Sequence, residues 1–170
     1  MSDELKYLSN ARLLDGSGET VPAEPYAMVV ASRRIEALAP QSQLPCPGGA
    51  EEYDLRGMTL MPGMIDCHDH LAIQEGSMVQ RAAIPPSLAV LKTAETLRDT
   101  LLGGFTSIRD AGGVDLGIKL AVEQGLIPGP RLKISVNLLS QFGGHNDHTE
   151  PAGIDSDFPR LPGVPSGICD

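Results

Sequence analysis

The chain has 170 residues, 41% of them hydrophobic, which suits one ordinary globular domain or two small ones, and its net charge of −9 argues against nucleic acid or anionic lipid as a partner. No apolar run approaches the roughly 18 residues of a membrane span, and the N-terminus lacks the basic and apolar regions of a signal peptide. The three scattered cysteines (Cys46, Cys67 and Cys169) favour reduced thiols over a disulfide framework, so we expect a cytoplasmic protein without a membrane partner.

The first 62 residues predict short β-strands. The segment Tyr7–Asp15 ends at an Asp-Gly turn signal, and Tyr26–Ala39 holds two apolar clusters on either side of a Ser-Arg-Arg turn, a pattern typical of a hairpin. After a loop that contains several prolines and glycines, Glu51–Gly63 predicts another strand pair around an Arg-Gly dipeptide. We therefore expect residues 1–62 to form a small β unit.

After Pro62 the pattern changes to alternating strands and helices. Met64–Asp66 is a short apolar strand, and Ser87–Leu102 carries leucines at helical spacing between a Pro-Pro pair and a Gly-Gly pair. Phe105–Ile108 predicts a second strand. Asp115–Gln124 predicts a second helix, which a glycine closes.

The segment Arg131–Leu138 alternates apolar and polar residues and predicts a third strand. Strand, helix, strand, helix, strand is the beginning of a parallel βα array, so the expected fold class is α/β. A third strand without a fourth beside it has an open edge. We therefore expect incomplete burial of the apolar residues on one of its faces, which are Leu132, Ile134, Val136 and Leu138.

Each of the three predicted strands after Pro62 leads into a polar loop. The loops read CHDH, RDAGG and GGHNDH. In a βα barrel the residues that carry the chemistry lie at the carboxyl ends of the strands, so these three loops together form the candidate functional site.

The first loop contains the pair His68 and His70. Residues two apart in an extended strand point the same way, so both imidazoles are expected to face one spot, where they suit zinc and similar ions. Asp69 and Cys67 are expected to point the other way. The alternative is that both histidines lie on a surface loop without binding anything. The position of the pair at the end of the first strand of a βα array favours the metal interpretation.

The stretch Asp54–Leu71, DLRGMTLMPGMIDCHDHL, resembles the metal-binding entry strand of the amidohydrolase superfamily, whose members share a Pro-Gly-apolar-Ile-Asp-x-His-x-His run. ARLLDGSGE is similar to the opening strands of that family, and GGFTSIRDAGG to its second barrel strand. IPGPRLKIS and GGHNDH are similar to the third strand in the branch of imidazolonepropionase-like enzymes and Xaa-Pro dipeptidases. The resemblance implies a small β-sandwich-type unit over residues 1–62. Residues 63–170 would then hold the first three βα units of an incomplete (β/α)₈ TIM-like barrel.

This resemblance also implies a metal-dependent hydrolase that acts on C–N bonds, of the amide, cyclic amide or dipeptide type, in a small-molecule or dipeptide-like substrate. His68 and His70 would bind the more buried ion of a centre with one or two divalent metals, with zinc the expected metal. Bound metal lowers the pKa of water towards about 7 and polarises a carbonyl, so a metal-activated water would attack the C–N carbonyl.

By the same resemblance, His145 of the Gly-Gly-His run would bind the substrate carbonyl or carboxylate. A plain polar loop is the alternative for His145 and for the neighbouring Asp147 and His148, and no role is assigned to His148. Asp110 is expected to be a structural loop residue and not a base.

A full barrel needs about 250 residues, whereas 170 − 62 = 108 residues follow Pro62. The family carries a bridging lysine, two histidines and a general-base aspartate on its fourth to eighth strands, and none of those strands is expected here. We therefore predict an incomplete part of such an enzyme that is inactive alone, and no catalytic residue is assigned. The alternative is a non-catalytic partial domain that pairs with another chain, and a homo-oligomer is left open.

Overall fold

The computed structural model describes residues 5–18, 23–73, 80, 83–141, 143–144 and 167–169. It contains two compact units, Met1–Pro62 and Gly63–Asp170, and each is described by itself. No helix within the described ranges combines the length and the apolarity needed to traverse a lipid bilayer.

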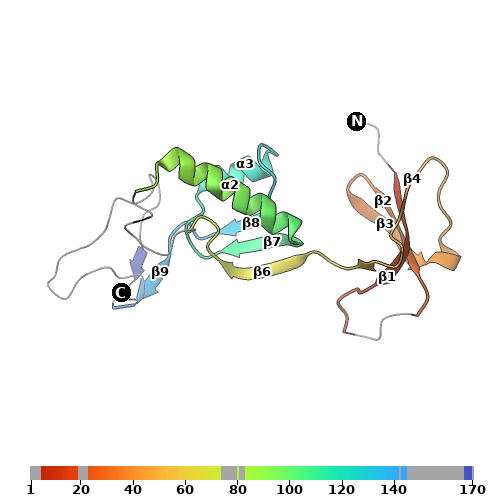
Figure 1. Cartoon of the computed structure of the whole chain (residues 1–170). Helices are drawn as coiled ribbons and strands as arrows, with labels where there is room; N and C mark the ends of the chain where they lie inside the picture. Colours follow the sequence, from red (N-terminus) through yellow and green to blue (C-terminus); the bar gives the residue numbers. More distant parts are fainter. Residues whose placement is uncertain are drawn as a thin grey trace. The chain divides into compact units, whose positions relative to one another are not determined.

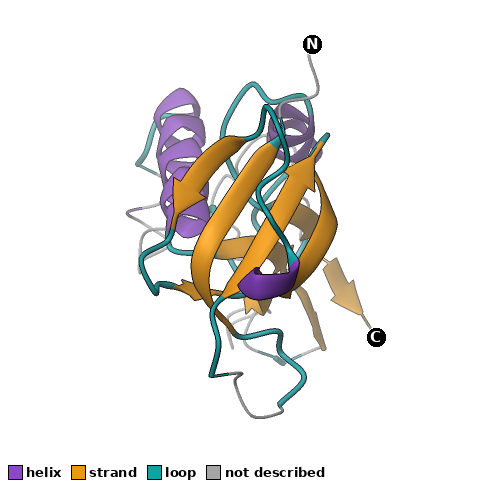
Figure 2. Ribbon diagram, turned by 90° about the vertical axis from the view of Figure 1, so that its right-hand side faces the viewer, coloured by secondary structure: helices purple, strands orange, loops and turns teal. Residues whose placement is uncertain are grey.

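The described part of the first unit is built from β-strands (Figure 1). Four of them lie in the order β3-β2-β1-β4, and β5 also pairs with β1. Figure 2 shows these strands side by side as a twisted sheet. The strands are β1 (Lys6–Leu13), β2 (Tyr26–Ala31), β3 (Arg34–Pro40), β4 (Glu51–Asp54) and β5 (Thr59–Leu60), and a short 3₁₀ helix η1 (Gln41–Gln43) follows β3.

The predicted hairpin is confirmed by β2 and β3, which pair antiparallel from Ala31↔Arg34 outward. Its two turn residues, Ser32 and Arg33, have φ angles of 49° and 64°. Two central residues with positive φ are the mark of a type I′ turn, whose twist matches that of the flanking strands. The Ser-Arg-Arg sequence therefore turns the chain without a glycine.

The expected strand pair between β4 and β5 is wrong, because both described strands pair with β1 in parallel. The segment between them stays attached to β1: the N–H of Leu55 donates to Ser9 O (2.9 Å) and that of Gly57 donates to Asn10 O (2.7 Å). Gly57 takes a φ of 79°, a left-handed conformation that costs glycine little. The Arg-Gly dipeptide therefore lies in a short turn between β4 and β5, and the two strands run in the same direction.

The core of the first unit centres on Tyr7, Ala27 and Val29. Tyr7 is 3% exposed, and its hydroxyl donates a hydrogen bond of 2.7 Å to the carbonyl of Leu44, which satisfies the polar end of a buried ring. Burial raises the pKa of Tyr7 above its ordinary value of 10.0, and the charges of Cys46 and Glu52 act in the same direction.

We expect Tyr7→Phe to lower the free energy of unfolding of the first unit by about 1 kcal/mol, because the Leu44 carbonyl loses its donor. The wild type should also lose stability as the pH rises above about 10. There the unfolded chain ionises its tyrosine first, while the folded state keeps the proton because its pKa is raised. Urea unfolding at pH 7 and pH 10.5 measures both effects. An equal loss of stability in the variant at high pH would contradict the role of Tyr7.

The second unit holds a parallel three-stranded sheet with helices on one face (Figure 1). The strand order is β6-β7-β8, and this confirms the expected α/β class. Its elements are β6 (Met64–Asp69), α2 (Pro86–Leu102), β7 (Phe105–Asp110), α3 (Leu116–Glu123), β8 (Arg131–Ile134), and a separate parallel pair of β9 (Leu139–Gln141) and β10 (Gly167–Cys169).

Both helices begin and end close to the predicted residues, because local signals define their ends. Proline occupies the first turn of α2, where its missing N–H costs nothing, and Gly103 caps the other end. Asp115 caps α3 at its N-terminus, where its Oδ1 accepts the N–H of Ile118 at 2.8 Å. The two helix predictions are therefore confirmed.

The helices and the sheet enclose one apolar core, formed by Leu71, Leu97, Ile108, Val114, Ile118 and Leu132. Leu132 is only 6% exposed, so the expectation that it is incompletely buried is wrong. Its side chain belongs to the face that the helices cover. Ile134, at the end of β8, is half-buried, as expected for the edge of this sheet, whereas Val136 and Leu138 are half-buried but lie beyond the end of the strand.

The predicted third strand extends too far, because β8 ends at Ile134. The N–H of Ser135 donates to Asp110 O (3.1 Å), and Val136 has a φ of 66°, a left-handed conformation that is costly for a β-branched residue. The chain thereby turns across the loop after β7. A side chain at Gly112 would lie 2.7 Å from Leu138 Cγ, so the crossing requires glycine there.

Candidate metal centre

The two histidines of the first loop lie together at the carboxyl end of β6. This strand extends three residues beyond the predicted end, so His68 belongs to it and His70 follows directly. The ring centroids are 5.2 Å apart and the ring planes meet at 85°. Both imidazoles therefore occupy one side of the chain, as the period-two geometry predicts. His68 is exposed and His70 is half-buried.

A backbone carbonyl orients the ring of His70. Nδ1 of His70 lies 2.9 Å from Gly112 O. Because a carbonyl oxygen only accepts, Nδ1 must carry the proton, and the neutral ring then presents the lone pair of Nε2. A carbonyl or carboxylate partner on the other nitrogen is the usual arrangement for a histidine that binds a metal.

Asp110 holds the loop that contains this carbonyl. It is fully buried, and its Oδ1 accepts the N–H groups of Gly112 (3.0 Å) and Val114 (3.2 Å), while its Oδ2 accepts that of Leu71 (2.9 Å). Burial raises the pKa of Asp110 above its ordinary value, although these three donors oppose the shift. All described hydrogen bonds of the Asp110 side chain go to backbone N–H groups, and the charge of His70 also lowers the pKa of Asp110.

The acidic side chains next to the histidines accept hydrogen bonds from the backbone of the same segment. Oδ1 of Asp66 accepts the N–H of His68 (2.9 Å), and Oδ1 of Asp69 accepts the N–H of His70 (2.7 Å). In the part of the chain that the structure describes, no third histidine, cysteine or acidic side chain joins the pair in a group that could hold a metal ion. The two imidazoles supply half of the four ligands that zinc usually takes.

The other predicted site residues lie outside the described residues. These are His145, expected to bind substrate, and its neighbours Asp147 and His148. The structure adds one residue to which the sequence assigned no role: Nε of Arg109 donates a 2.5 Å hydrogen bond to Cys67 O, beside His68. The signal that could have found it is an arginine near the carboxyl end of a predicted strand, next to the candidate site.

The family model for the amidohydrolase family matches residues 59–157, more than half of the chain. The chain belongs to the amidohydrolase family. This confirms the resemblance seen in the sequence. The matched range includes His68 and His70 of the β6 loop.

Two curated relatives of this amidohydrolase chain differ in how much of it they match. Ochratoxinase of Aspergillus niger is 30% identical over 146 residues, which cover 83% of this chain and 30% of the relative. Imidazolonepropionase of Aeromonas hydrophila is 46% identical over 48 residues, which cover 28% of this chain and 12% of the relative.

Solved structures match the amidohydrolase chain over nearly its whole length. A prolidase complexed with N-methylphosphonate-L-proline gives a TM-score of 0.81 at 32% identity, covering 98% of this chain and 40% of the prolidase. Another amidohydrolase gives 0.79 at 30% identity, covering 98% of this chain and 41% of that one. The chain thus spans about 30% of the length of ochratoxinase and about 40% of the length of these two structures.

Proposed function

We propose that this chain is the N-terminal part of a metal-dependent hydrolase that cleaves C–N bonds, with His68 and His70 as ligands of a divalent ion. The observation that carries the proposal is the paired imidazoles, 5.2 Å apart, one of which has its Nδ1 engaged by Gly112 O. Family membership and the likeness to a prolidase support the class of reaction. Amide, cyclic amide and dipeptide bonds are the candidate substrates.

The architecture that we propose is a small β-sandwich-type unit over residues 1–62, followed over 63–170 by the first three βα units of a (β/α)₈ barrel. The order β6, α2, β7, α3, β8 in a parallel sheet supports it, since a barrel of this kind repeats the βα unit. The coverage of about 40% of the prolidase structure supports it as well.

The donor set fits a divalent ion such as zinc, because neutral imidazole is a preferred zinc ligand and the proton on Nδ1 leaves Nε2 available. When bound, such an ion lowers the pKa of water and polarises a carbonyl. Within this chain, His68 and His70 would bind the ion, and Gly112 would keep the proton of His70 on Nδ1. The substrate role of His145 remains a prediction.

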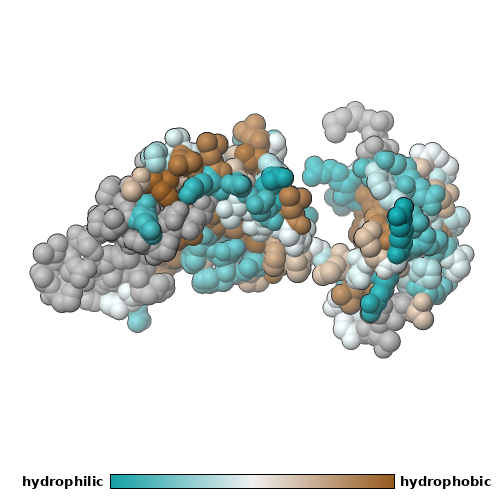
Figure 3. All heavy atoms as spheres, in the orientation of Figure 1, coloured by the Kyte–Doolittle hydropathy of each residue, from teal (hydrophilic) through white to brown (hydrophobic). Residues whose placement is uncertain are grey.

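A partner-binding role is a second candidate, favoured by apolar side chains on the surface of the second unit. Hydrophobic residues gather over the helices in Figure 3. Leu91 on α2 is 67% exposed, and Leu102 at the end of that helix is 70% exposed. Exposed apolar surface of this kind marks sites that bind other protein segments. The chain would then be a non-catalytic partial domain that pairs with another chain.

Zinc titration of the 170-residue chain tests the metal proposal. We expect His68→Asn with His70→Asn to weaken zinc binding more than about 100-fold, since two of the ligands are lost. The matched control is His148→Asn, which removes a histidine without an assigned role and should leave the affinity unchanged. Unchanged zinc affinity in the double variant, or an equal loss in the control, would contradict the proposed site.

A further inference from the structure

The pairing between β6 and β7 is interrupted beside His68. Paired positions run Ile65↔Ser107 and Asp66↔Ile108, and then resume only at Asp69↔Asp110, so three steps along β6 correspond to two along β7. Extra residues of this kind disrupt the backbone ladder locally. The peptide between Cys67 and His68 lies within the interruption.

Side chains hold this peptide where the regular ladder is broken. Its carbonyl, Cys67 O, accepts a hydrogen bond of 2.5 Å from Nε of Arg109, and its N–H, that of His68, donates to Oδ1 of Asp66 at 2.9 Å. Both polar atoms of one peptide are thus held by charged groups, which form stronger hydrogen bonds than neutral ones. Because this peptide leads directly into His68, its orientation sets the direction in which the imidazole leaves the strand.

The position of Arg109 on its strand explains how it reaches this peptide. Its neighbours Ile108 and Asp110 are 2% and 0% exposed and belong to the face that the helices cover. Alternation along β7 places Arg109 on the opposite face, where it is exposed. A long side chain there can lie across the sheet onto β6.

We propose that Arg109 is a positioning residue for His68, which fixes the Cys67–His68 peptide so that the two imidazoles keep the separation that a shared metal ion needs. The inference rests on the proposed metal-binding function. Removing a group that orients a metal ligand typically weakens metal binding by about 10- to 100-fold.

The positive charge of Arg109 makes it possible to test how the residue affects metal binding. A guanidinium repels a divalent cation, so an arginine that acts only through its charge would weaken metal binding, and its removal would strengthen it. An arginine that acts by holding the peptide has the opposite effect on removal. The direction of the change in affinity therefore separates the two roles.

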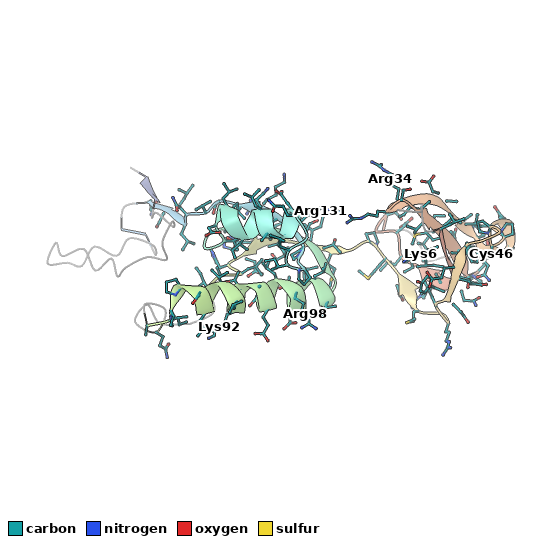
Figure 4. The ribbon with its side chains drawn as sticks, turned by 90° about the horizontal axis from the view of Figure 1, so that it is seen from above. Lys6, Arg34, Cys46, Lys92, Arg98 and Arg131 are labelled. Carbon is teal, nitrogen blue, oxygen red and sulfur yellow. The ribbon has the colours of Figure 1, made fainter. Side chains whose placement is uncertain are left out.

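The matched control is Arg131, which carries the same charge on the same face of the sheet. Arg109 pairs with Lys133 in the register of β7 and β8, and Arg131 lies two residues earlier along β8. Figure 4 shows Arg131 at the end of the second unit where β8 begins, whereas His68 lies where β6 ends. No described ion pair involves Arg131.

Zinc affinity of the full chain is measured for Arg109→Met, Arg109→Lys and Arg131→Met, together with the melting temperature of each. We expect Arg109→Met to bind zinc about 10- to 100-fold more weakly. Arg109→Lys should recover part of that loss because Lys keeps a donor, and Arg131→Met should bind as tightly as the wild type or more tightly. The melting temperature of Arg109→Met should lie only slightly below that of Arg131→Met, because the hydrogen bond that Arg109 loses lies at the surface.

A second readout works without metal. The amide nitrogen of His68 belongs to the peptide that Arg109 holds, so its NMR shift in the metal-free chain should move in Arg109→Met and stay in place in Arg131→Met. If the wild type binds no zinc, the proposed function fails, whereas this shift still tests the role of Arg109. Unchanged zinc affinity and an unchanged His68 shift in Arg109→Met would overturn the inference, as would tighter zinc binding.

Discussion

Replacing Asp110 with alanine should lower the free energy of unfolding of the second unit by about 3–5 kcal/mol. The carboxylate accepts three backbone N–H groups, from Leu71, Gly112 and Val114, and is itself fully buried. Alanine leaves these donors without a partner, and an unpaired buried donor costs more than a lost hydrogen bond on the surface. Chemical denaturation followed by circular dichroism measures the loss.

The variant Asp110→Asn distinguishes the hydrogen bonds that Oδ1 accepts from the one that Oδ2 accepts. An amide oxygen in the place of Oδ1 still accepts from Gly112 and Val114, while the NH₂ group that replaces Oδ2 faces the N–H of Leu71. We expect about half of the loss seen with alanine. Equal stability of Asp110→Ala and the wild type would show that the loop after β7 is held by other contacts.

Truncation of Leu97 to alanine should cost about 3–4 kcal/mol. Leu97 is fully buried in the core between α2 and the sheet, and its Cβ lies 3.2 Å from the place where a Cβ of Gly129 would be. Backbone packed this closely cannot collapse fully into the space that is left, so a cavity term adds to the lost transfer free energy.

The control for this truncation is Leu91→Ala on the same helix. Leu91 is 67% exposed, and its loss should change the free energy of unfolding by less than about 0.5 kcal/mol. Both variants have the same change in helix propensity, so their difference reports burial alone. Similar losses in the two variants would mean that the assigned face of α2 is wrong.

The elements that the sequence predicts well are those whose ends depend on neighbouring residues. The proline pair at the start of α2 and the Asp115 cap of α3 act within one turn, so the helix boundaries follow from local chemistry. The hairpin of β2 and β3 is similarly local. Family membership also follows from a local run, because the His68–His70 spacing and the Pro-Gly before it are contiguous.

The errors concern choices that depend on distant residues. Whether β4 pairs with β5 or with β1 depends on hydrogen bonds to a strand more than forty positions earlier, since 51 − 6 = 45. The alternation of Arg131–Leu138 continues past the end of β8, because Val136 and Leu138 are half-buried although they lie beyond the strand. The positions of Arg109 beside Cys67 and of Gly112 beside His70 need the register between strands, which one sequence does not contain.

The parallel pairing of β4 and β5 with β1 has a consequence for the order in which the first unit folds. The hairpin of β2 and β3 closes over two residues and can form within microseconds. By contrast, Lys6↔Glu51 and Arg12↔Thr59 join positions 51 − 6 = 45 and 59 − 12 = 47 apart, so chain entropy must be lost before these contacts contribute. During synthesis, this edge of β1 therefore stays unpaired until β4 leaves the ribosome, and β5 completes its pairing only afterwards, so the first unit is most open to aggregation in that interval.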